Sequence, residues 1–306
     1  MALEHLVDCT EMMIGATQLA RPESADFSIE PNEVESASDA VYGAYENDIT
    51  YYDLKASLNT QDPLAAGIVA ALTDAYAIAA QGQLANAVTY RSLSILHGVL
   101  TGLSIDLVDN QPGKLRADFQ NRAASATATL ADEYAGAAGS APTLVNRRGT
   151  IRIQAASSTF TPDGGDPVIL EGLERVNWQA QADVDARSSP GAKCVDLVTV
   201  MGWRVRGNIA LGDKSLTTTQ TLAATLAVLA RGALAVQCRV TGFGSEATTP
   251  ADAIITLDRV KFGGGGEGLR TKGPGTGNLS FGGILRAANN DLLALADMVA
   301  VTEAGA

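Results

Sequence analysis

The chain has 306 residues, of which 46% are apolar and only 18% are charged, and its formal net charge is −12 at pH 7. This length suits two domains of ordinary size, each with a core of its own. The acidic balance argues against binding of nucleic acid through a basic surface, and no apolar run is long enough to cross a bilayer. The N-terminus is acidic and lacks the basic start of a signal peptide, so we expect synthesis in a cytosol.

The negative charge is concentrated in the first half of the chain. Residues 1–145 carry 19 acidic and 6 basic side chains, whereas residues 146–306 carry 15 acidic and 16 basic ones. Such an acidic half could repel nucleic acid from a wall, face a less acidic neighbour, or simply keep the protein soluble.

The first half begins with residues 3–20, where we expect an opening strand or strand pair. Residues 22–48 contain eight acidic residues, two prolines and no basic residue, which predicts a long irregular arm. Residues 49–58 alternate polar and apolar side chains and therefore predict a half-buried strand. The stretch 62–82 has capping residues, a proline in its first turn, an apolar stripe and a terminal glycine, all typical of a helix.

The remainder of this half is expected to be β-structure that leads into a linker. Strands are predicted at 88–95 and 99–108, on either side of a turn at His97 and Gly98, and a short strand follows at 114–119. Residues 123–145 are rich in Ala, Ser and Gly, so they are expected to connect two domains, with a helical turn near Thr129.

The second half is predicted to contain mostly strands, one helix, a glycine-rich loop and a C-terminal helix. We expect strands at 150–156, 173–186, 194–211, 233–240, 254–262 and 278–285, helices from about 217 to 232 and from 291 to 301, and a loop at 263–277.

The two halves repeat the same order of elements about 150 residues apart. At a shift of 150 or slightly more, apolar and glycine positions coincide: Leu72 with Leu222, Gly82 with Gly232, Leu84 with Leu234, Tyr52 with Trp203, and Asp106 with Asp258. A duplicated domain can stand in for two subunits, which favours a protein that builds rings or tubes.

Together these patterns predict a mainly β (α+β) fold with two tandem β-sandwich or barrel domains, each flanked by one helix. The predicted boundaries are 1–122 for the first domain, 123–145 for the linker and 146–306 for the second domain. Because turns join neighbouring strands, we expect antiparallel sheets.

Nothing in the sequence assembles an enzyme, a cofactor site or a metal site. Cys9, Cys194 and Cys238 are scattered, with no Cys-x-x-Cys or Cys/His cluster. His5 and His97 have no serine elbow near them in sequence, and we interpret His97 as structural. No catalytic residue, no cofactor and no metal ligand is therefore assigned.

Two weaker patterns also have simpler interpretations. Gly263, Gly265 and Gly268 match G-x-G-x-x-G, but a proline and further glycines follow where a helix would have to begin, so a phosphate cradle is not expected. The carboxylate pairs Asp183/Asp185 and Asp106/Asp109 could serve acid–base chemistry or a metal, but a solvated strand face explains them better.

The second half resembles the tail tube proteins of long-tailed bacteriophages, a fold shared with type VI secretion tubes and several baseplate proteins. The resemblance rests on the strand 197–207, the Thr-rich helix 217–232, the strands 233–240 and 254–262, the glycine-rich loop and the closing strand 278–284. It extends more weakly to residues 1–120. It implies rings of six such domains, and therefore of three chains when each chain carries two copies.

The same resemblance implies which surfaces make contacts. Ring-to-ring contacts are expected from the arm and the glycine-rich loop, with Glu30, Glu33, Glu35, Gly263, Glu267, Arg270 and Lys272 as candidates. Candidates for the lumen or the ring interface are Asp53, Lys55, Arg204 and Arg206. Expected partners are further copies of the chain, other tail proteins, and DNA that passes through the lumen without specific binding, in a virion tail and with no membrane.

Two alternatives to a tube stay open at this point. A distal tail, baseplate hub or tail terminator protein would use the same fold in a single ring. A capsid decoration or glycan-binding β-sandwich would belong to another class, and the aromatic content of 5% argues against it.

Overall fold

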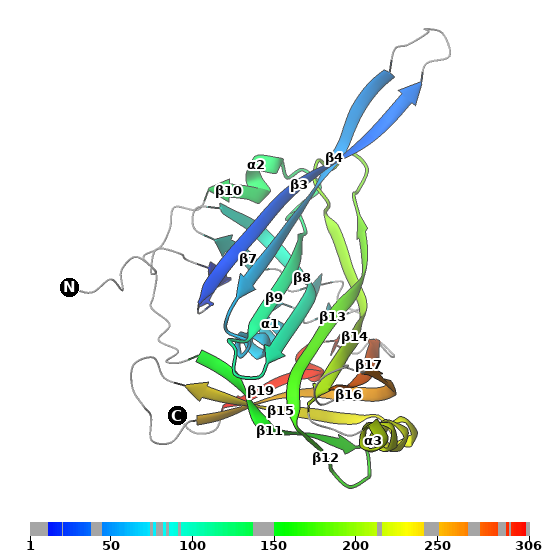
Figure 1. The fold of residues 1–306 in the computed structure, drawn as a ribbon. Helices are drawn as coiled ribbons and strands as arrows, with labels where there is room; N and C mark the ends of the chain where they lie inside the picture. The colour runs from blue at the N-terminus through cyan, green and yellow to red at the C-terminus, as the bar shows by residue number, and fades with distance from the viewer. Residues whose placement is uncertain are drawn as a thin grey trace, which may run out of the picture.

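The computed structural model describes residues 12–19, 21–37, 45–73, 76–77, 82–83, 86–90, 93–136, 150–212, 216–241, 251–268, 276–286, 292–293 and 295–303. This part of the chain is mostly antiparallel β-strand, and it contains three α-helices (Figure 1). The predicted mainly β class is therefore confirmed. Within the described residues, no helix combines the length and apolar character needed to span a bilayer.

The strands of the first half are β1 (Met12–Ile14), β2 (Thr17–Gln18), β3 (Pro22–Ala37), β4 (Tyr45–Thr60), β5 (Tyr76–Ala77), β6 (Gly82–Gln83), β7 (Asn86–Tyr90), β8 (Leu93–Val108), β9 (Lys114–Asn121) and β10 (Tyr134–Gly136). Those of the second half are β11 (Thr150–Pro162), β12 (Val168–Glu171), β13 (Leu173–Arg187), β14 (Leu197–Leu211), β15 (Gly232–Thr241), β16 (Ala251–Gly268), β17 (Thr276–Arg286), β18 (Leu292–Leu293) and β19 (Val299–Glu303). The helices are α1 (Ala65–Thr73), α2 (Leu130–Glu133), α3 (Leu216–Val228) and a short 3-10 helix, η2 (Leu295–Asp297).

Strand pairing in the second half repeats that of the first. One set runs β3-β4-β9-β8 in the first half and β13-β14-β17-β16 in the second. Another set runs β2-β1-β7-β8 and recurs as β12-β11-β15-β16. The long strands β8 and β16 belong to both sets, because their two ends pair with different partners.

The repeat holds residue by residue in the pairing register. Ala25 lies opposite Leu58, and 151 positions later Val176 lies opposite Ile209. Irregularities in the register recur at the same shift, since Thr50 in β4 and Met201 in β14 are each skipped in the pairing. Because bulges are specific local features of a strand pair, their recurrence supports a duplicated unit more strongly than element order alone.

The shift between the repeats is not constant along the chain. It is 151 residues for β3 and β4, 146 for β1 and β7, and 162 for β8 and β9, as their registers require. Tyr52 therefore corresponds to Trp203, as predicted. The predicted match of Asp106 with Asp258 is wrong, because the register places Asp106 with Gly268.

The two repeats join into one continuous sheet. β8 pairs with β13 over residues 102–108 and 175–181, so the order becomes β3-β4-β9-β8-β13-β14-β17-β16 (Figure 1). We call this the wall sheet, and the β8–β13 pairing its seam. The projecting β3–β4 hairpin extends beyond the rest of the molecule in Figure 1.

The wall sheet is apolar on one face only. Leu103, Ile105 and Leu107 of β8 are buried, and Val176, Trp178 and Ala180 of β13 lie beside them. A second β layer, formed by the other strand set of each repeat, covers this face, and the buried apolar side chains of both halves form one connected cluster. In the second repeat Phe160, Phe262 and Phe281 link the layers, with ring centroids 5.0 and 5.8 Å apart.

The predicted arm at 22–48 is wrong for the part that the structure describes. Residues 22–37 form strand β3, and β4 already begins at Tyr45. Between Ser24 and Glu30, polar residues alternate with Ala25, Phe27 and Ile29, which is the two-residue period of a strand. Prolines are tolerated here because, among the described strands, β3 pairs with β4 alone and so has one open side.

The predicted helix at 62–82 starts as expected but is shorter. Asp62 caps it by accepting a hydrogen bond from the Leu64 backbone N–H at 3.1 Å. The helix α1 then ends at Thr73, and β5 and β6 follow. β5 pairs with β18 from the far end of the chain, a tertiary contact that overrides local helix preference.

Three further predictions need correction. The expected turn at His97 lies inside β8, which runs unbroken from Leu93 to Val108. The predicted linker contains α2 near its expected place, but β10 follows and pairs with β8, so residues up to Gly136 pack with the first repeat. The glycine-rich loop is strand at both ends, in β16 and β17, because glycine backbones can pair like any others.

The predicted C-terminal helix at 291–301 is also wrong. The described residues there form β18, η2 and β19, and β19 pairs with β16. Of the apolar residues that indicated a helix, Leu295 and Met298 are buried all the same, and so is Val299 beside them. The β-branched residues Val299 and Val301 favour a strand where an open edge of β16 is within reach.

Candidate functional site

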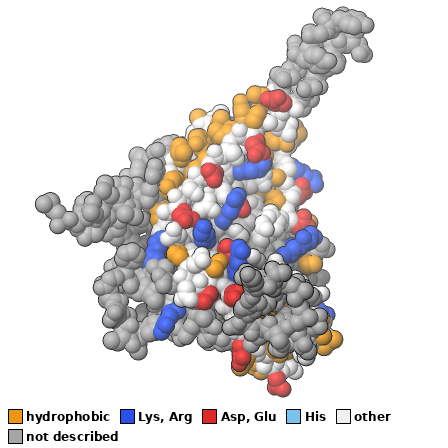
Figure 2. All heavy atoms as spheres, in the orientation of Figure 1, with side chains coloured by type: hydrophobic (Ala, Val, Ile, Leu, Met, Phe, Trp, Pro, Cys, Tyr) orange, Lys and Arg blue, Asp and Glu red, His pale blue; other side chains and the backbone are white. Residues whose placement is uncertain are grey.

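The face of the wall sheet that no described element covers is the candidate functional site. We call it the polar face, because polar and charged side chains alternate there with the buried apolar ones. Figure 2 shows acidic and basic side chains interspersed on the face turned to the viewer. Its charged residues in the described part of the chain include Asp26, Glu30, Asp53, Lys55, Asp106, Lys114, Arg116, Asp118, Arg175, Asp183, Arg204, Arg206 and Lys261.

An ion pair spans the seam on the polar face. Arg175 of β13 donates from Nε and Nη2 to the two carboxylate oxygens of Asp106 of β8, both at 2.8 Å. These hydrogen bonds, which outweigh the effect of partial burial, raise the pKa of Arg175 above its ordinary value. The fork geometry adds a specific side-chain contact to the backbone pairing of β8 with β13 that joins the two repeats.

Other pairs tie neighbouring strands within the first repeat. Lys55 of β4 contacts Glu30 of β3 at 2.5 Å and Asp53 at 3.3 Å. Partial burial lowers the pKa of Lys55, but the hydrogen bonds and charges of these two carboxylates outweigh it and raise the pKa. Arg116 donates to Asp118 at 2.8 Å, and Asp118 also accepts a hydrogen bond from Ser57 at 2.7 Å.

A hollow of about 830 Å³ lies over the seam and takes its lining from both repeats. Basic side chains surround it, among them Lys114, Arg116, Arg175 and Arg206. Arg116 and Arg175 are already paired with carboxylates. The aromatic residues at the hollow, Trp178 and Phe281, belong to the buried face and are only 3% and 4% exposed, so they offer no stacking surface.

The structure brings the four predicted lumen residues onto one surface. Asp53 and Lys55 lie on β4, and Arg204 and Arg206 lie on β14, all on the polar face. Arg206 lines the hollow over the seam, and Arg204 lies beside it along β14. The two strands that carry these residues occupy equivalent positions in the two repeats.

The predicted ring-to-ring residues are spread more widely. Glu30 belongs to the polar face, and Glu33 and Glu35 lie farther along β3. Gly263 is the unpaired residue of a bulge in β16, and Glu267 lies in the same strand. Arg270 and Lys272 lie outside the described residues.

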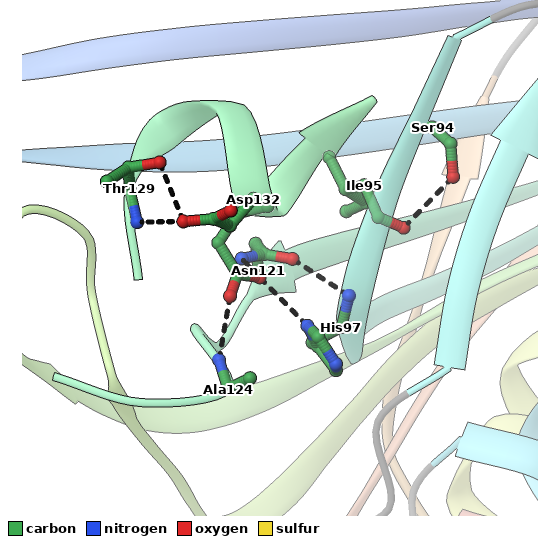
Figure 3. Close-up of polar contacts among 8 residues, drawn as sticks. Ser94, Ile95, His97, Asn121, Ala124, Thr129 and Asp132 are labelled. Carbon is green, nitrogen blue, oxygen red and sulfur yellow. Dashed lines mark hydrogen bonds and ion pairs between the residues drawn. The ribbon is translucent and has the colours of Figure 1, made fainter. Parts of the chain in front are cut away.

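A buried carboxylate that sequence reasoning missed supports the edge of the wall sheet. Glu133 of α2 is 1% exposed and accepts hydrogen bonds from Asn121 Nδ2 at 3.0 Å and from the Ala124 N–H at 2.8 Å. His97 Nδ1 lies 2.8 Å from the same carboxylate (Figure 3). The sequence offered no signal for this burial, because Glu133 looks like any acidic residue at a helix start.

This cluster positions an aromatic residue behind β3. Glu133 is followed directly by Tyr134 of β10, whose ring packs against Phe27 of β3 with 6.5 Å between centroids. Thr129 and Asp132 cap α2, and their hydrogen bonds lower the pKa of Asp132 below its ordinary value. His97 contacts this buried carboxylate and does not line the hollow over the seam.

The patterns that could have indicated chemistry lie in strands of the wall sheet. Gly263, Gly265 and Gly268 lie in a strand and not before a helix. Asp185 pairs with Arg187 at 2.7 Å, while Asp183 lies across an irregularity in the register. No three His, Cys, Asp or Glu side chains of the described residues gather as a metal site would require.

No protein-family model matches this sequence, and no curated protein matches it significantly.

Proposed function

We propose that this chain is a structural virion protein, the tail tube subunit of a long-tailed bacteriophage. Three copies would close a pseudo-hexameric ring, and stacked rings would form a tube that conducts DNA. The chain would assemble in the host cytoplasm and join other tail proteins in the virion.

One observation carries the proposal: two copies of one strand arrangement merge into a single sheet with a polar face that no described element covers. Each copy presents the same set of strands to that face. In the proposed ring, one chain would therefore replace two neighbouring subunits. Three chains would continue the same geometry around a closed ring. A single active site would not require a duplicated wall of this kind.

The chemistry of the polar face supports passage of DNA better than capture of DNA. Three of its basic residues, Lys55, Arg116 and Arg175, already contact carboxylates. A surface that binds DNA tightly needs many free Lys and Arg side chains that can displace counterions from phosphates. The mixed charge replaces the uniformly acidic wall that the net charge would favour, and it is equally unsuited to strong DNA binding.

Negative-stain electron microscopy of the purified chain, with the mass of its smallest closed assembly, tests the proposal. Stacked hollow rings with three chains per ring are the expected result. Isolated trimeric rings that never stack would instead identify a hub or terminator protein of the same fold. A monomer at every concentration would refute the assembly and return attention to a decoration or glycan-binding module.

A further inference from the structure

The wall sheet ends in two strand edges that differ from each other. β3 pairs with β4 on one side, and no described strand pairs with its other side. At the opposite end, residues 261–268 of β16 pair with β17, and their other side likewise has no partner among the described residues. Unpaired edges present rows of free backbone N–H and C=O groups, which are open to pairing with another chain.

The repeat shows what the partner of each edge is. The equivalent of β3 in the second repeat is β13, and the equivalent of β16 in the first is β8. Those two strands pair with each other at the seam. We infer that β16 of one copy of this chain pairs with β3 of the next copy in the register of the seam, an inference that rests on the proposed ring and specifies its joint.

The register of this joint follows from the shifts between the repeats. At the seam Gln179 lies opposite Ser104, Ala180 opposite Leu103, and Gln181 opposite Gly102. Subtracting 151 from each β13 residue number gives the equivalent residue of β3, and adding 162 to each β8 residue number gives the equivalent residue of β16. The result places Ser28 opposite Gly266, Ile29 opposite Gly265 and Glu30 opposite Gly264.

The exposure of β3 agrees with a missing neighbour. Trp178 and Ala180, which β8 covers at the seam, are 3% and 0% exposed. Their equivalents Phe27 and Ile29 are only partly buried, and Ile29 is 39% exposed. A strand added beside β3 would remove this apolar area from water, as β8 does for β13.

Side-chain volumes are complementary at the joint. The seam pairs a large residue of β8, Leu103, with the small Ala180. The joint reverses this arrangement, because Gly265 of β16 faces the large Ile29 of β3. Glycines at 264–266 leave room for the β3 side chains, and a bulky neighbour across the strands stabilises glycine in a sheet. The joint also ends before Pro31, which has no backbone N–H to donate.

The two edges differ, so the contact is head-to-tail. A head-to-tail contact between identical chains gives a closed ring when its rotation divides a full turn. The antiparallel seam inside the chain then recurs between chains, and every wall strand has two neighbours.

Paired cysteines test the register directly. In a Cys9→Ser background, one variant combines Ser28→Cys with Gly266→Cys and another combines Ile29→Cys with Gly265→Cys, which covers both kinds of cross-strand site. The matched control, Ser28→Cys with Gly264→Cys, is two residues out of register. Chains are oxidised and separated by mass under denaturing, non-reducing conditions.

The expected result is a ladder of covalent dimers and trimers for at least one in-register variant and at most traces for the control. Mixing the two single variants of a pair should give dimers only. Rings that form normally but crosslink only in the control variant, or in none, would overturn the register and leave the proposed tube intact. Chains that stay monomeric at all concentrations would overturn both.

Discussion

Ile29 and Ala180 occupy the same position in the two repeats, yet Ile29 is 39% exposed and Ala180 is fully buried. The difference comes from the neighbouring strand, because β8 covers β13 whereas no described strand covers β3 on that side. The outer strand β3 of the wall sheet therefore carries an apolar side chain where an interior strand would bury one.

Replacing Ile29 with Asp should weaken assembly without unfolding the chain. The side chain lies on an outer strand, so a carboxylate there stays hydrated in the monomer but would be buried against the next copy. Burying an unpaired charge is costly, so we expect the concentration needed for assembly to rise at least tenfold. Sedimentation velocity across a concentration series measures it.

The matched control is Ile284→Asp, since Ile284 is 56% exposed on the polar face of β17. Both variants should show the circular dichroism of the wild type, and only Ile29→Asp should lose assembly. Equal assembly of the two variants would argue against β3 as a joint.

Replacing Glu133 with Ala should destabilise the fold by about 1–3 kcal/mol, because it leaves the buried Asn121 amide and the Ala124 N–H without their acceptor. Urea denaturation followed by fluorescence measures the loss. Since Tyr134 follows Glu133 and packs on Phe27, assembly should weaken as well.

Glu133→Gln serves as the conservative variant, because its amide oxygen can still accept one of these hydrogen bonds. Asp132→Ala is the neighbouring control and should cost less than Glu133→Ala, because Asp132 is exposed. If Asp132→Ala lowered the free energy of unfolding by the same amount, the α2 cap and not the buried carboxylate would be what stabilises this region.

Periodic strands with a clear alternation were predictable from sequence. β13 and β14 lie close to their predicted limits, since Trp178, Ala180 and Ala182 point inward and polar residues alternate with them. β3 was missed because its acids and prolines resemble a loop, although an outer strand with one solvated face tolerates both. The C-terminal segment was missed because its apolar run fits helix and strand equally until β16 provides a partner.

The polar face could be predicted only in pieces. The two-residue period of a strand predicts that Asp53 and Lys55 share one face, and that Arg204 and Arg206 do so too. Sequence alone could not reveal that β8 pairs with β13 and so brings both pairs onto one surface. The Asp106–Arg175 ion pair joins residues 69 positions apart, and only the register of the seam brings them together.

The described cysteines should be inert in the folded chain. Cys194 and Cys238 are buried, and burial raises the pKa of Cys238 to about 12 and that of Cys194 above its ordinary value. In a Cys9→Ser variant, a thiol reagent at pH 8 should label nothing quickly in the native protein and both thiols after unfolding.

The same shift predicts how stability depends on pH. The thiol of Cys238 ionises near pH 9 in the unfolded chain but only near pH 12 in the folded chain. Its contribution to the free energy of unfolding is therefore complete below pH 9 and is lost as pH rises toward 12. Replacing Cys238 with Ala should flatten this part of the stability curve, measured by urea denaturation from pH 8 to pH 10.5. An unchanged slope would contradict the raised pKa.

Gly207 tests how closely β14 packs against its neighbours β13 and β17 in the wall sheet. A Cβ at this position would lie 2.2 Å from Phe281 Cζ and 2.6 Å from the Asn177 carbonyl oxygen, so an alanine has no space. Its equivalent in the first repeat is Ala56, which lies opposite Phe119. We expect Gly207→Ala to lower the free energy of unfolding by about 1–3 kcal/mol, as overpacking of a core does.

Gly263→Ala is the control, because a Cβ there meets nothing within 4 Å, and its free energy of unfolding should stay within about 0.5 kcal/mol of wild type. If Gly207→Ala were as stable as this control, the backbones of β13 and β14 would have to separate readily, and the wall sheet would be less rigid than its packing indicates.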